Sequence, residues 1–163
     1  MKKVHIYTDG SSRGNPGPGG YGTILVYGEH EREMSGGFEL TTNNRMELMA
    51  AIVGLETLTK KCAVIVTSDS KYVINALNEG WLAGWKNNGW VKKNRERVKN
   101  ADLWKRVDAL NESHDVEWIW VKGHAGHEHN ERCDILATEA AQSKGLTADE
   151  GYLAEQEGDQ ELF

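Results

Sequence analysis

The chain is poor in the residues that mark secreted, membrane-spanning or disulfide-rich proteins. Its two cysteines, Cys62 and Cys133, have the spacing of neither a disulfide framework nor a zinc site, which favours a reducing compartment. No stretch approaches the roughly 18 consecutive apolar residues that a membrane-spanning helix needs. The N-terminus runs straight into a strand-like segment without the apolar core of a signal peptide. We therefore expect a cytoplasmic protein.

Internal repeats are also absent, and no linker-like stretch occurs before residue 145. With 163 residues, of which 39% are hydrophobic and 27% charged, the chain suits a single domain around one core. We expect that domain to cover residues 1–145. Residues 147–163 contain six acidic residues and no lysine or arginine, so residues 146–163 are expected to form an acidic tail that is partly disordered.

Basic residues do not outnumber acidic ones, but they are concentrated in one segment. The net charge of −6 disfavours a nucleic-acid partner, yet the six acids of the tail account for it, since the rest of the chain holds 19 acidic and 19 basic residues. Within this neutral body, residues 86–106 carry eight cations against two acids, interleaved with the tryptophans of the same region. Such a segment is typical of surfaces that bind phosphates and stack on sugars or bases. The alternative is a solvated helix face with tryptophans in the core.

Hydrophobic periodicity predicts five strands and four helices. Strands are expected at residues 4–9, 21–27, 31–40, 63–68 and 116–121, and helices near residues 44–59, 71–79, 101–111 and 131–142. The first three strands follow one another through turns and predict an antiparallel meander. The first and fourth are joined through a helix, so they are expected to be parallel with a right-handed crossover. This order predicts an α/β fold.

Four carboxylates stand where an ionised side chain is costly to bury. Asp9 and Asp69 each end an apolar strand, Glu47 is the one charged residue of the apolar stretch 46–55, and Asp134 lies near the start of the last predicted helix. A buried carboxylate needs a counter-charge, hydrogen bonds or a metal. The carboxyl ends of neighbouring parallel strands form the edge where α/β sheets bind ligands, so Asp9, Glu47 and Asp69 are expected to meet around a divalent cation. Nothing else explains Asp134, which we assign to the same cluster.

A polar segment precedes the helix that carries Glu47. Thr42, Asn43 and Asn44 lie at its N-terminus, where backbone N–H groups and the helix dipole favour phosphate. Asparagine side chains can also contact base edges or a ribose 2′-OH. Asn15, from the glycine-rich loop at residues 10–20, is expected near the same edge of the sheet. These four residues are therefore candidate substrate contacts.

Two other motifs suggest a dinucleotide site and a zinc site, but neither has the spacing or local structure that such a site needs. Residues 17–22 match the GxGxxG pattern, but they continue as a strand, whereas a dinucleotide fingerprint must open a helix. Three histidines between residues 124 and 129 invite a zinc site, but their loop spacing does not suit one. Beside a metal-bound phosphate, His124 is expected to move protons during catalysis. For His127 and His129 the expectation is a solvated loop.

Five separated segments, in order along residues 3–145, resemble bacterial type 1 ribonuclease H. These are Thr8-Asp-Gly-Ser11 with Gly14-Asn-Pro-Gly-Pro-Gly-Gly20, then Thr42-Asn-Asn-Arg-Met-Glu-Leu48, Ser68-Asp-Ser70, Trp120-Val-Lys-Gly-His-Ala-Gly-His127 and Asn130-Glu-Arg-Cys-Asp134. The resemblance implies the ribonuclease H-like fold, a five-stranded mixed sheet of order 3-2-1-4-5 with helices on both faces.

The resemblance also implies roles for individual residues. Asp9, Glu47, Asp69 and Asp134 would be the metal ligands, and His124 the mobile proton-handling residue. The substrate would be an RNA–DNA hybrid. Contacts to it would come from Asn15, Asn43 and Asn44, beside Thr42, and from a basic protrusion that grips the DNA strand with residues including Trp81, Trp85, Lys86 and Lys99. Two features differ from the family's pattern: Asn87 and Asn88 stand where relatives often carry cations, and Lys71 where many carry glutamine.

The activity implied is endonucleolytic hydrolysis of the RNA strand, leaving 5′-phosphate and 3′-hydroxyl ends. Two Mg²⁺ ions about 4 Å apart, with Mn²⁺ as a possible substitute, would activate the attacking water and stabilise the leaving oxygen. Alternatives are a non-catalytic hybrid- or RNA-binding module, a zinc hydrolase, and a DNA-cutting relative of the same fold. We expect a monomer. The C-terminal residues 160–163 faintly resemble peptides that dock on the bacterial sliding clamp, which would be a weak contact with a replication protein.

Overall fold

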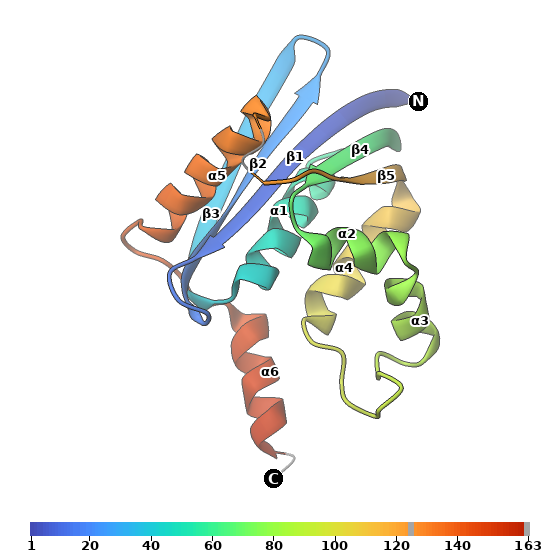
Figure 1. The fold of residues 1–163 in the computed structure, drawn as a ribbon, viewed down its shortest axis with the longest axis vertical. Helices are drawn as coiled ribbons and strands as arrows, with labels where there is room; N and C mark the ends of the chain where they lie inside the picture. The colour runs from blue at the N-terminus through green and yellow to red at the C-terminus, as the bar shows by residue number, and fades with distance from the viewer. Residues whose placement is uncertain (124–125, 162–163) are drawn as a thin grey trace.

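The computed structural model describes residues 1–123 and 126–161, with side chains up to residue 158. A single sheet of order β3-β2-β1-β4-β5 runs through the molecule (Figure 1). Strands β1 (Lys2–Ser12), β2 (Gly17–Tyr27) and β3 (His30–Thr41) form the antiparallel meander, while β4 (Cys62–Ser68) pairs in parallel with β1 and β5 (Asp115–Trp120) in parallel with β4. The predicted mixed sheet and its order are confirmed.

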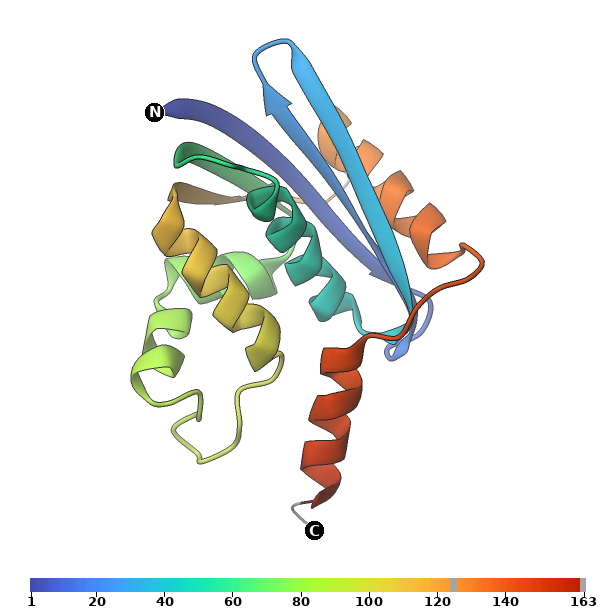
Figure 2. The same ribbon diagram turned by 180° about the vertical axis from the view of Figure 1, so that it is seen from behind.

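Helices cover both faces of this sheet, also as predicted (Figures 1 and 2). Helices α1 and α4 pack together on one face, and α5 packs against β1, β2 and β3 on the other. The helices are α1 (Asn43–Glu56), α2 (Lys71–Asn78), α3 (Trp81–Asn87), α4 (Ala101–Ser113), α5 (Glu128–Ala141) and α6 (Glu150–Glu161). In the described part of the chain, none of them is both long and apolar enough to cross a bilayer.

The main core lies between the sheet and α1. Apolar residues of α1 are buried on nearly every side of the helix, as the sequence predicted, because α4 and α2 cover what the sheet does not. Val4, Ile6, Val64 and Val66 point to this core from β1 and β4, in the alternation expected of strands with one face towards a helix. The core therefore fixes α1 against the two central strands, and with it the position of Glu47.

Helix α3 was not predicted, since Gly80, Gly84 and the Asn87-Asn-Gly89 at its end are residue types that favour turns. In the structure Gly80 adopts a left-handed conformation (φ 77°) that starts this short helix, and Leu82 anchors it in the core. We call residues 81–99 the basic protrusion. The part of it after α3 has one isolated bridge, between Val91 and Arg97. The protrusion forms the lobe beside α4 in Figures 1 and 2.

The C-terminal segment contains a helix that the sequence did not predict. This helix, α6, follows a bridge between Thr147 and Phe38 that extends the edge of β3, while partial disorder at the very end of the chain stays a prediction. The physical reason is that the acids of this segment are not all solvated. Asp149 is 6% exposed and is paired with the buried Arg45. Acidic composition alone suggested disorder, but a buried counter-charge orders the segment.

Candidate active site

Three of the four predicted carboxylates converge at one edge of the sheet. Asp9 lies on β1 near its carboxyl end, Asp69 directly follows the parallel neighbour β4, and Glu47 lies in the second turn of α1. One oxygen atom from each side chain lies within 4.8 Å of the others. This spacing allows a single cation to contact all three residues.

Glu47 reaches this edge because α1 approaches β1 unusually closely. Thr42 caps the helix by accepting a hydrogen bond from the Arg45 N–H at 3.2 Å. The Gly10 N–H then donates to Asp9 Oδ1 at 2.9 Å and to Glu47 Oε1 at 3.0 Å. A Cβ atom at position 10 would come within 2.6 Å of the Met46 carbonyl carbon. Glycine at this position is therefore what lets the helix and strand bring two carboxylates together.

The electrostatics of the cluster are unfavourable without a cation. Burial, together with the nearby charges of Asp69 and Asp134, raises the pKa of Asp9 to about 7. Burial raises the pKa of Glu47 well above its ordinary value, and the charges of Asp9 and Asp69 add to this. Glu47 Oε2 is buried and has no hydrogen-bond donor among the described residues. An orphaned oxygen within an all-oxygen donor set suits a hard divalent cation such as Mg²⁺.

Asp134, on α5, lies outside the tight group of three but lines the same cavity. This cavity has a volume of about 390 Å³. It is lined by Asp9, Gly10, Ser11, Asn43, Glu47, Asp69, Ser70 and Asp134. The fourth carboxylate thus comes from the helix on the opposite face of the sheet, which a periodicity argument could not foresee.

Of the predicted asparagine contacts, Asn43 lines this cavity. The Asn43 N–H donates to Asn15 Oδ1 at 3.0 Å, which ties the glycine-rich loop to the start of α1. Asn43 and Asn44 are exposed, and Thr42 is half-buried. These side chains therefore form one polar patch beside the carboxylates. We call Asn15, Thr42, Asn43 and Asn44 the asparagine patch.

The three histidines between residues 124 and 129 have different positions relative to the predictions. His124 lies outside the described residues. His127 precedes α5 at its N-cap position. His129 is not the solvated loop residue that the sequence predicted, because it stacks on Tyr7 at 4.5 Å between ring centroids and contacts Glu31 Oε1 at 2.8 Å.

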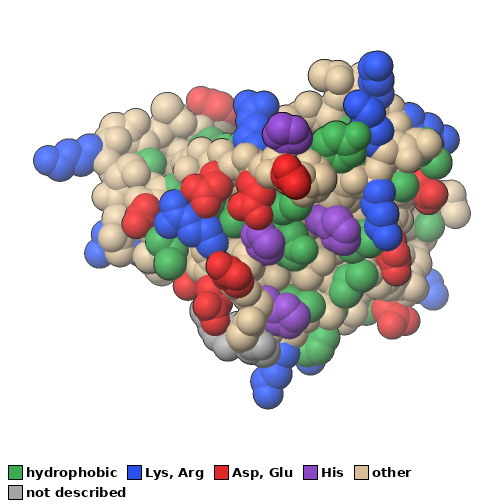
Figure 3. Space-filling model, turned by 90° about the horizontal axis from the view of Figure 1, so that it is seen from above, with side chains coloured by type: hydrophobic (Ala, Val, Ile, Leu, Met, Phe, Trp, Pro, Cys, Tyr) green, Lys and Arg blue, Asp and Glu red, His purple; other side chains and the backbone are tan. Residues whose placement is uncertain are grey.

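A zinc centre finds no support in the described part of the chain, where the one group of side chains close enough to hold a metal contains no histidine. Figure 3 shows a face of the molecule on which several histidines lie among acidic side chains. Its lysines and arginines are dispersed rather than gathered in a patch. A concentrated basic surface has to be sought elsewhere, at the protrusion.

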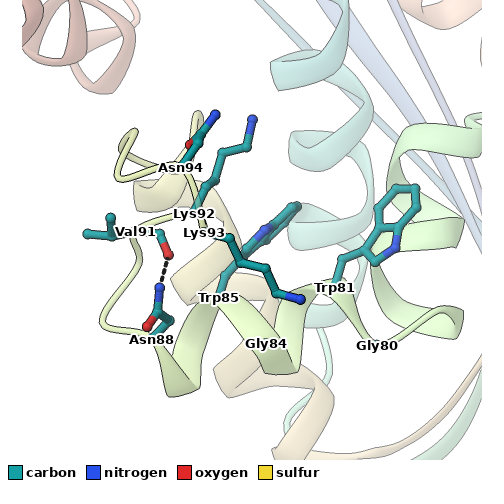
Figure 4. Close-up of a pocket in the computed structure, with 9 residues that line it drawn as sticks. All are labelled: Gly80, Trp81, Gly84, Trp85, Asn88, Val91, Lys92, Lys93 and Asn94. Atoms are coloured by element: carbon teal, nitrogen blue, oxygen red, sulfur yellow. Dashed lines mark hydrogen bonds between the residues drawn. The ribbon is translucent and has the colours of Figure 1, made fainter.

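The basic protrusion contains a cavity of about 880 Å³ with tryptophan and lysine side chains on its walls (Figure 4). Trp81 is 46% exposed, whereas Trp85 packs edge-on against the buried Trp104 at 5.6 Å. Trp85 thus packs against the core while Trp81 is open to solvent, and binding of nucleic acid by either stays a prediction. Lys92, Lys93 and Asn94 also line this cavity. They were counted in the local charge but not singled out, because sequence does not tell which cations share a surface.

The other two predicted contacts of the protrusion do not line this cavity. Lys86 instead pairs with Glu112 at 2.7 Å and with Asp108 at 2.9 Å on α4. Lys99 is exposed at the end of the protrusion. The structure therefore does not place Lys86 with the tryptophans, because these ion pairs hold its ammonium group against α4.

Sequence reasoning missed a contact next to Asp69. The Trp120 indole N–H donates to the Asp69 carbonyl oxygen at 3.1 Å, and Lys71 Nζ lies 5.0 Å from the centre of the Trp120 ring. Trp120 is 41% exposed, although large apolar side chains are usually covered. Trp118 and Trp120 lie two positions apart on β5 and so share one face of the strand, and no local signal shows that Trp118 is buried while Trp120 is exposed.

The fold and the site define a class: an α/β protein with a carboxylate metal site at the carboxyl ends of two central parallel strands, next to a basic, aromatic surface. The RNase H family model matches residues 1–142. The Ribonuclease H of Aeromonas salmonicida (strain A449) is 59% identical over 152 residues, which cover 93% of this chain and 98% of that protein. The chain belongs to the RNase H family.

Solved structures agree with this assignment. LC9-RNase H1, a type 1 RNase H with the type 2 active-site motif, is 33% identical with a TM-score of 0.76, covering 87% of this chain and 73% of that chain. LC11-RNase H1 in complex with an RNA/DNA hybrid is 25% identical with a TM-score of 0.63, covering 85% of this chain and 96% of that chain.

Proposed function

We propose that this chain is a metal-dependent endoribonuclease that hydrolyses the RNA strand of RNA–DNA hybrids. The observation that carries the proposal is the convergence of Asp9, Glu47 and Asp69, with a buried Glu47 oxygen that lacks a donor in the described structure. Membership of the RNase H family supports the reaction, and the complex of LC11-RNase H1 with a hybrid supports the substrate.

The proposed metal ligands are Asp9, Glu47, Asp69 and Asp134. Two bound Mg²⁺ ions would activate a water for in-line attack and stabilise the leaving 3′-oxygen, giving 5′-phosphate and 3′-hydroxyl ends. Four ionised carboxylates match the charge of two such ions, and Mn²⁺ has the same preference for oxygen ligands. Within the chain, the Gly10 N–H orients Asp9 and Glu47, and the Trp120 indole fixes the backbone of Asp69.

We propose that His124 moves a proton as the leaving group departs. Substrate selection would divide between two surfaces. The asparagine patch would contact 2′-OH groups and base edges of the hybrid. The basic protrusion, with Trp81, Trp85 and Lys99 and the newly located Lys92 and Lys93, would hold the phosphates and sugars of the DNA strand. Lys86 would take part only if it left its ion pairs with α4.

The test is a panel of labelled hybrid, duplex DNA, duplex RNA and single strands, each with Mg²⁺, Mn²⁺ or EDTA. The proposal expects cleavage of the RNA strand of the hybrid with Mg²⁺ or Mn²⁺, and none with EDTA. Hybrid binding without cleavage at any metal concentration would favour the non-catalytic module. Cutting of duplex DNA would favour a DNA-cutting relative of the fold.

The proposal also covers the location of the enzyme, its oligomeric state and a possible protein partner. A cytoplasmic location is supported by the two buried cysteines, which are both free thiols. A monomer is proposed and is checked by light scattering at assay concentration. The suggested clamp contact of residues 160–163 involves side chains outside the described ones. Deleting residues 158–163 without any change in a clamp pull-down would end that suggestion.

A further inference from the structure

Arg45 is an arginine that the proposed chemistry does not use, yet it is 1% exposed. Its guanidinium donates from Nε to Asp149 Oδ2 at 2.7 Å and from Nη2 to Asp149 Oδ1 at 3.0 Å. It also donates to both carboxylate oxygens of Asp102, at 2.8 and 2.7 Å. All three nitrogens are thus engaged by two carboxylates in paired contacts, which is the most directional geometry an arginine can make.

The residues of this cluster come from three places that bear on substrate binding. Arg45 belongs to the first turn of α1, between Asn44 of the asparagine patch and Glu47 of the metal site. Asp102 lies in the first turn of α4, directly after the basic protrusion ends. Asp149 precedes α6 and also accepts the Thr41 hydroxyl at 2.7 Å. The cluster therefore connects the asparagine patch, the end of the protrusion and the C-terminal helix.

Asn100, the residue that follows Lys99, is held by the same assembly. Its N–H donates to Glu155 Oε2 on α6 at 2.8 Å, and its side-chain amide donates to the Tyr72 hydroxyl at 3.0 Å. It has a left-handed backbone conformation (φ 61°), in which the chain turns from the protrusion into α4. Both ribbon views place α6 beside this turn (Figures 1 and 2). The acidic C-terminal segment thus contacts the base of the protrusion.

Packing around the cluster leaves it little freedom. A Cβ atom at Gly151, in the first turn of α6, would collide with the Asp102 carboxylate and the Arg45 guanidinium. Burial alone would raise the pKa of Asp102, but Arg45 keeps it below its ordinary value, so the pair stays ionised. Removing one carboxylate would leave a buried, partly unpaired guanidinium, which must move towards water or another acceptor.

We propose that Asp149 and Asp102 are positioning residues, which act through Arg45 to hold the basic protrusion at a fixed distance and angle from the asparagine patch. The idea rests on the proposed function, because it assumes that one hybrid contacts both surfaces. The acidic C-terminal segment is then part of the substrate-binding machinery, although it touches no substrate. Loosening the cluster costs affinity for hybrids that span both surfaces and leaves the bond-breaking step alone.

The experiment measures kcat and KM with hybrids of about 12 and about 4 base pairs. Phosphates are about 3.4 Å apart along a strand, so the number of base pairs sets how far each hybrid reaches across the protein. Asp149→Asn keeps the shape of the side chain and removes its charge. With the long hybrid we expect its KM to rise about fivefold, because small misplacements of a binding surface weaken binding strongly, while kcat stays within about twofold. With the short hybrid, which is meant to occupy the asparagine patch and the carboxylates alone, the KM should match that of the wild type.

Two controls separate positioning from general loss of stability. Glu33→Gln removes a similar paired contact, from Arg132, on the α5 side of the sheet. Ile24→Val removes one buried carbon from the core under α5. Both should leave the KM for either hybrid unchanged when compared at temperatures equally far below their unfolding midpoints. If Asp149→Asn does not fold, Asp102→Asn takes its place, since Asp102 is partly exposed and its loss is milder.

An equal rise in KM for long and short hybrids, or an equal rise in Ile24→Val, would show a merely structural role and overturn the proposal. So would an unchanged KM with the long hybrid. A double variant of Asp149→Asn with Lys99→Ala should raise KM less than the product of the two single effects, because both act at the protrusion. These outcomes presuppose that the wild type cleaves hybrids. If it cleaves none, the proposed function fails, and that result is distinct from a failure of the positioning idea.

Discussion

Two buried charge clusters are attached to the first turns of α1, two residues apart, and they are opposite in kind. At Arg45 a guanidinium meets two carboxylates, and each of its nitrogens has a partner. At Glu47 carboxylates meet carboxylates, pKa values rise, and one oxygen has no donor in the described structure. The first cluster is balanced within the chain and joins its elements. The second is balanced only by an added cation, so it marks the site of function.

The strongest test of this difference between the clusters is to neutralise one carboxylate of the cluster around Glu47. Asp9→Asn removes a proposed metal ligand without changing side-chain size, so hybrid cleavage with Mg²⁺ should fall at least about a thousandfold, a loss of roughly 4 kcal/mol in the barrier. Circular dichroism should show an intact fold, and hybrid binding in EDTA should persist. Cleavage within about tenfold of the wild type would reject the carboxylate cluster as the catalytic centre.

Neutralising a carboxylate in the first cluster should have its main effect on stability. Asp149→Asn leaves the buried Arg45 with one carboxylate partner instead of two, and should lower the free energy of unfolding by roughly 3 kcal/mol. Urea unfolding in the absence of metal measures this loss. The exposed pair of Glu33 and Arg132 provides the comparison, because Glu33→Gln should cost less than about 1 kcal/mol. Equal losses in the two variants would contradict the distinction between buried and exposed pairs.

The two clusters also differ in how far sequence could predict them. Asp9 and Asp69 end apolar strands that topology makes neighbours, and Glu47 is conspicuous as a lone charge in an apolar helix, so these could be inferred from local pattern. Arg45 could not. Its partner Asp149 is more than a hundred positions away, in a segment whose acidic composition suggested disorder. Sequence shows what a segment contains, but a buried pair depends on which distant segments meet.

The same difference between local patterns and distant contacts explains which other elements were predicted correctly. Strands β1, β4 and β5 were located because short runs of β-branched, aromatic and apolar residues are a local signal. Helix α3 was missed, because Gly80 and Gly84 favour a turn and the sequence does not show that Leu82 is buried in the core. His129 was assigned to a solvated loop, since no local signal shows that its ring would stack on Tyr7, a residue of the first strand. The errors thus lie where a tertiary contact overrides the local preference.

The second cluster should destabilise the metal-free protein in a pH-dependent way. The pKa of Asp9 is raised from 3.8 to about 7, so the folded state binds more protons than the unfolded state between these values. Metal-free stability should therefore fall as the pH rises from about 4 to 7, and Asp9→Asn should be more stable than the wild type at pH 8 by roughly 1–3 kcal/mol. Urea unfolding in EDTA at several pH values measures both. A variant less stable than the wild type at pH 8 would contradict the repulsion.

The smallest expected effect is the stabilisation of the folded protein by the metal ion, which should bind at only one of the two clusters. Mg²⁺ at about ten times its dissociation constant should raise the free energy of unfolding by about 1.4 kcal/mol, because it binds the folded state alone. The gain should be the same in Asp149→Asn, whose altered cluster holds no metal, and should be lost or much reduced in Asp9→Asn. Thermal unfolding with and without Mg²⁺, at constant ionic strength, measures the difference. An equal gain in all three proteins would mean that the ion binds elsewhere, and the carboxylates around Glu47 would then need another explanation for their burial.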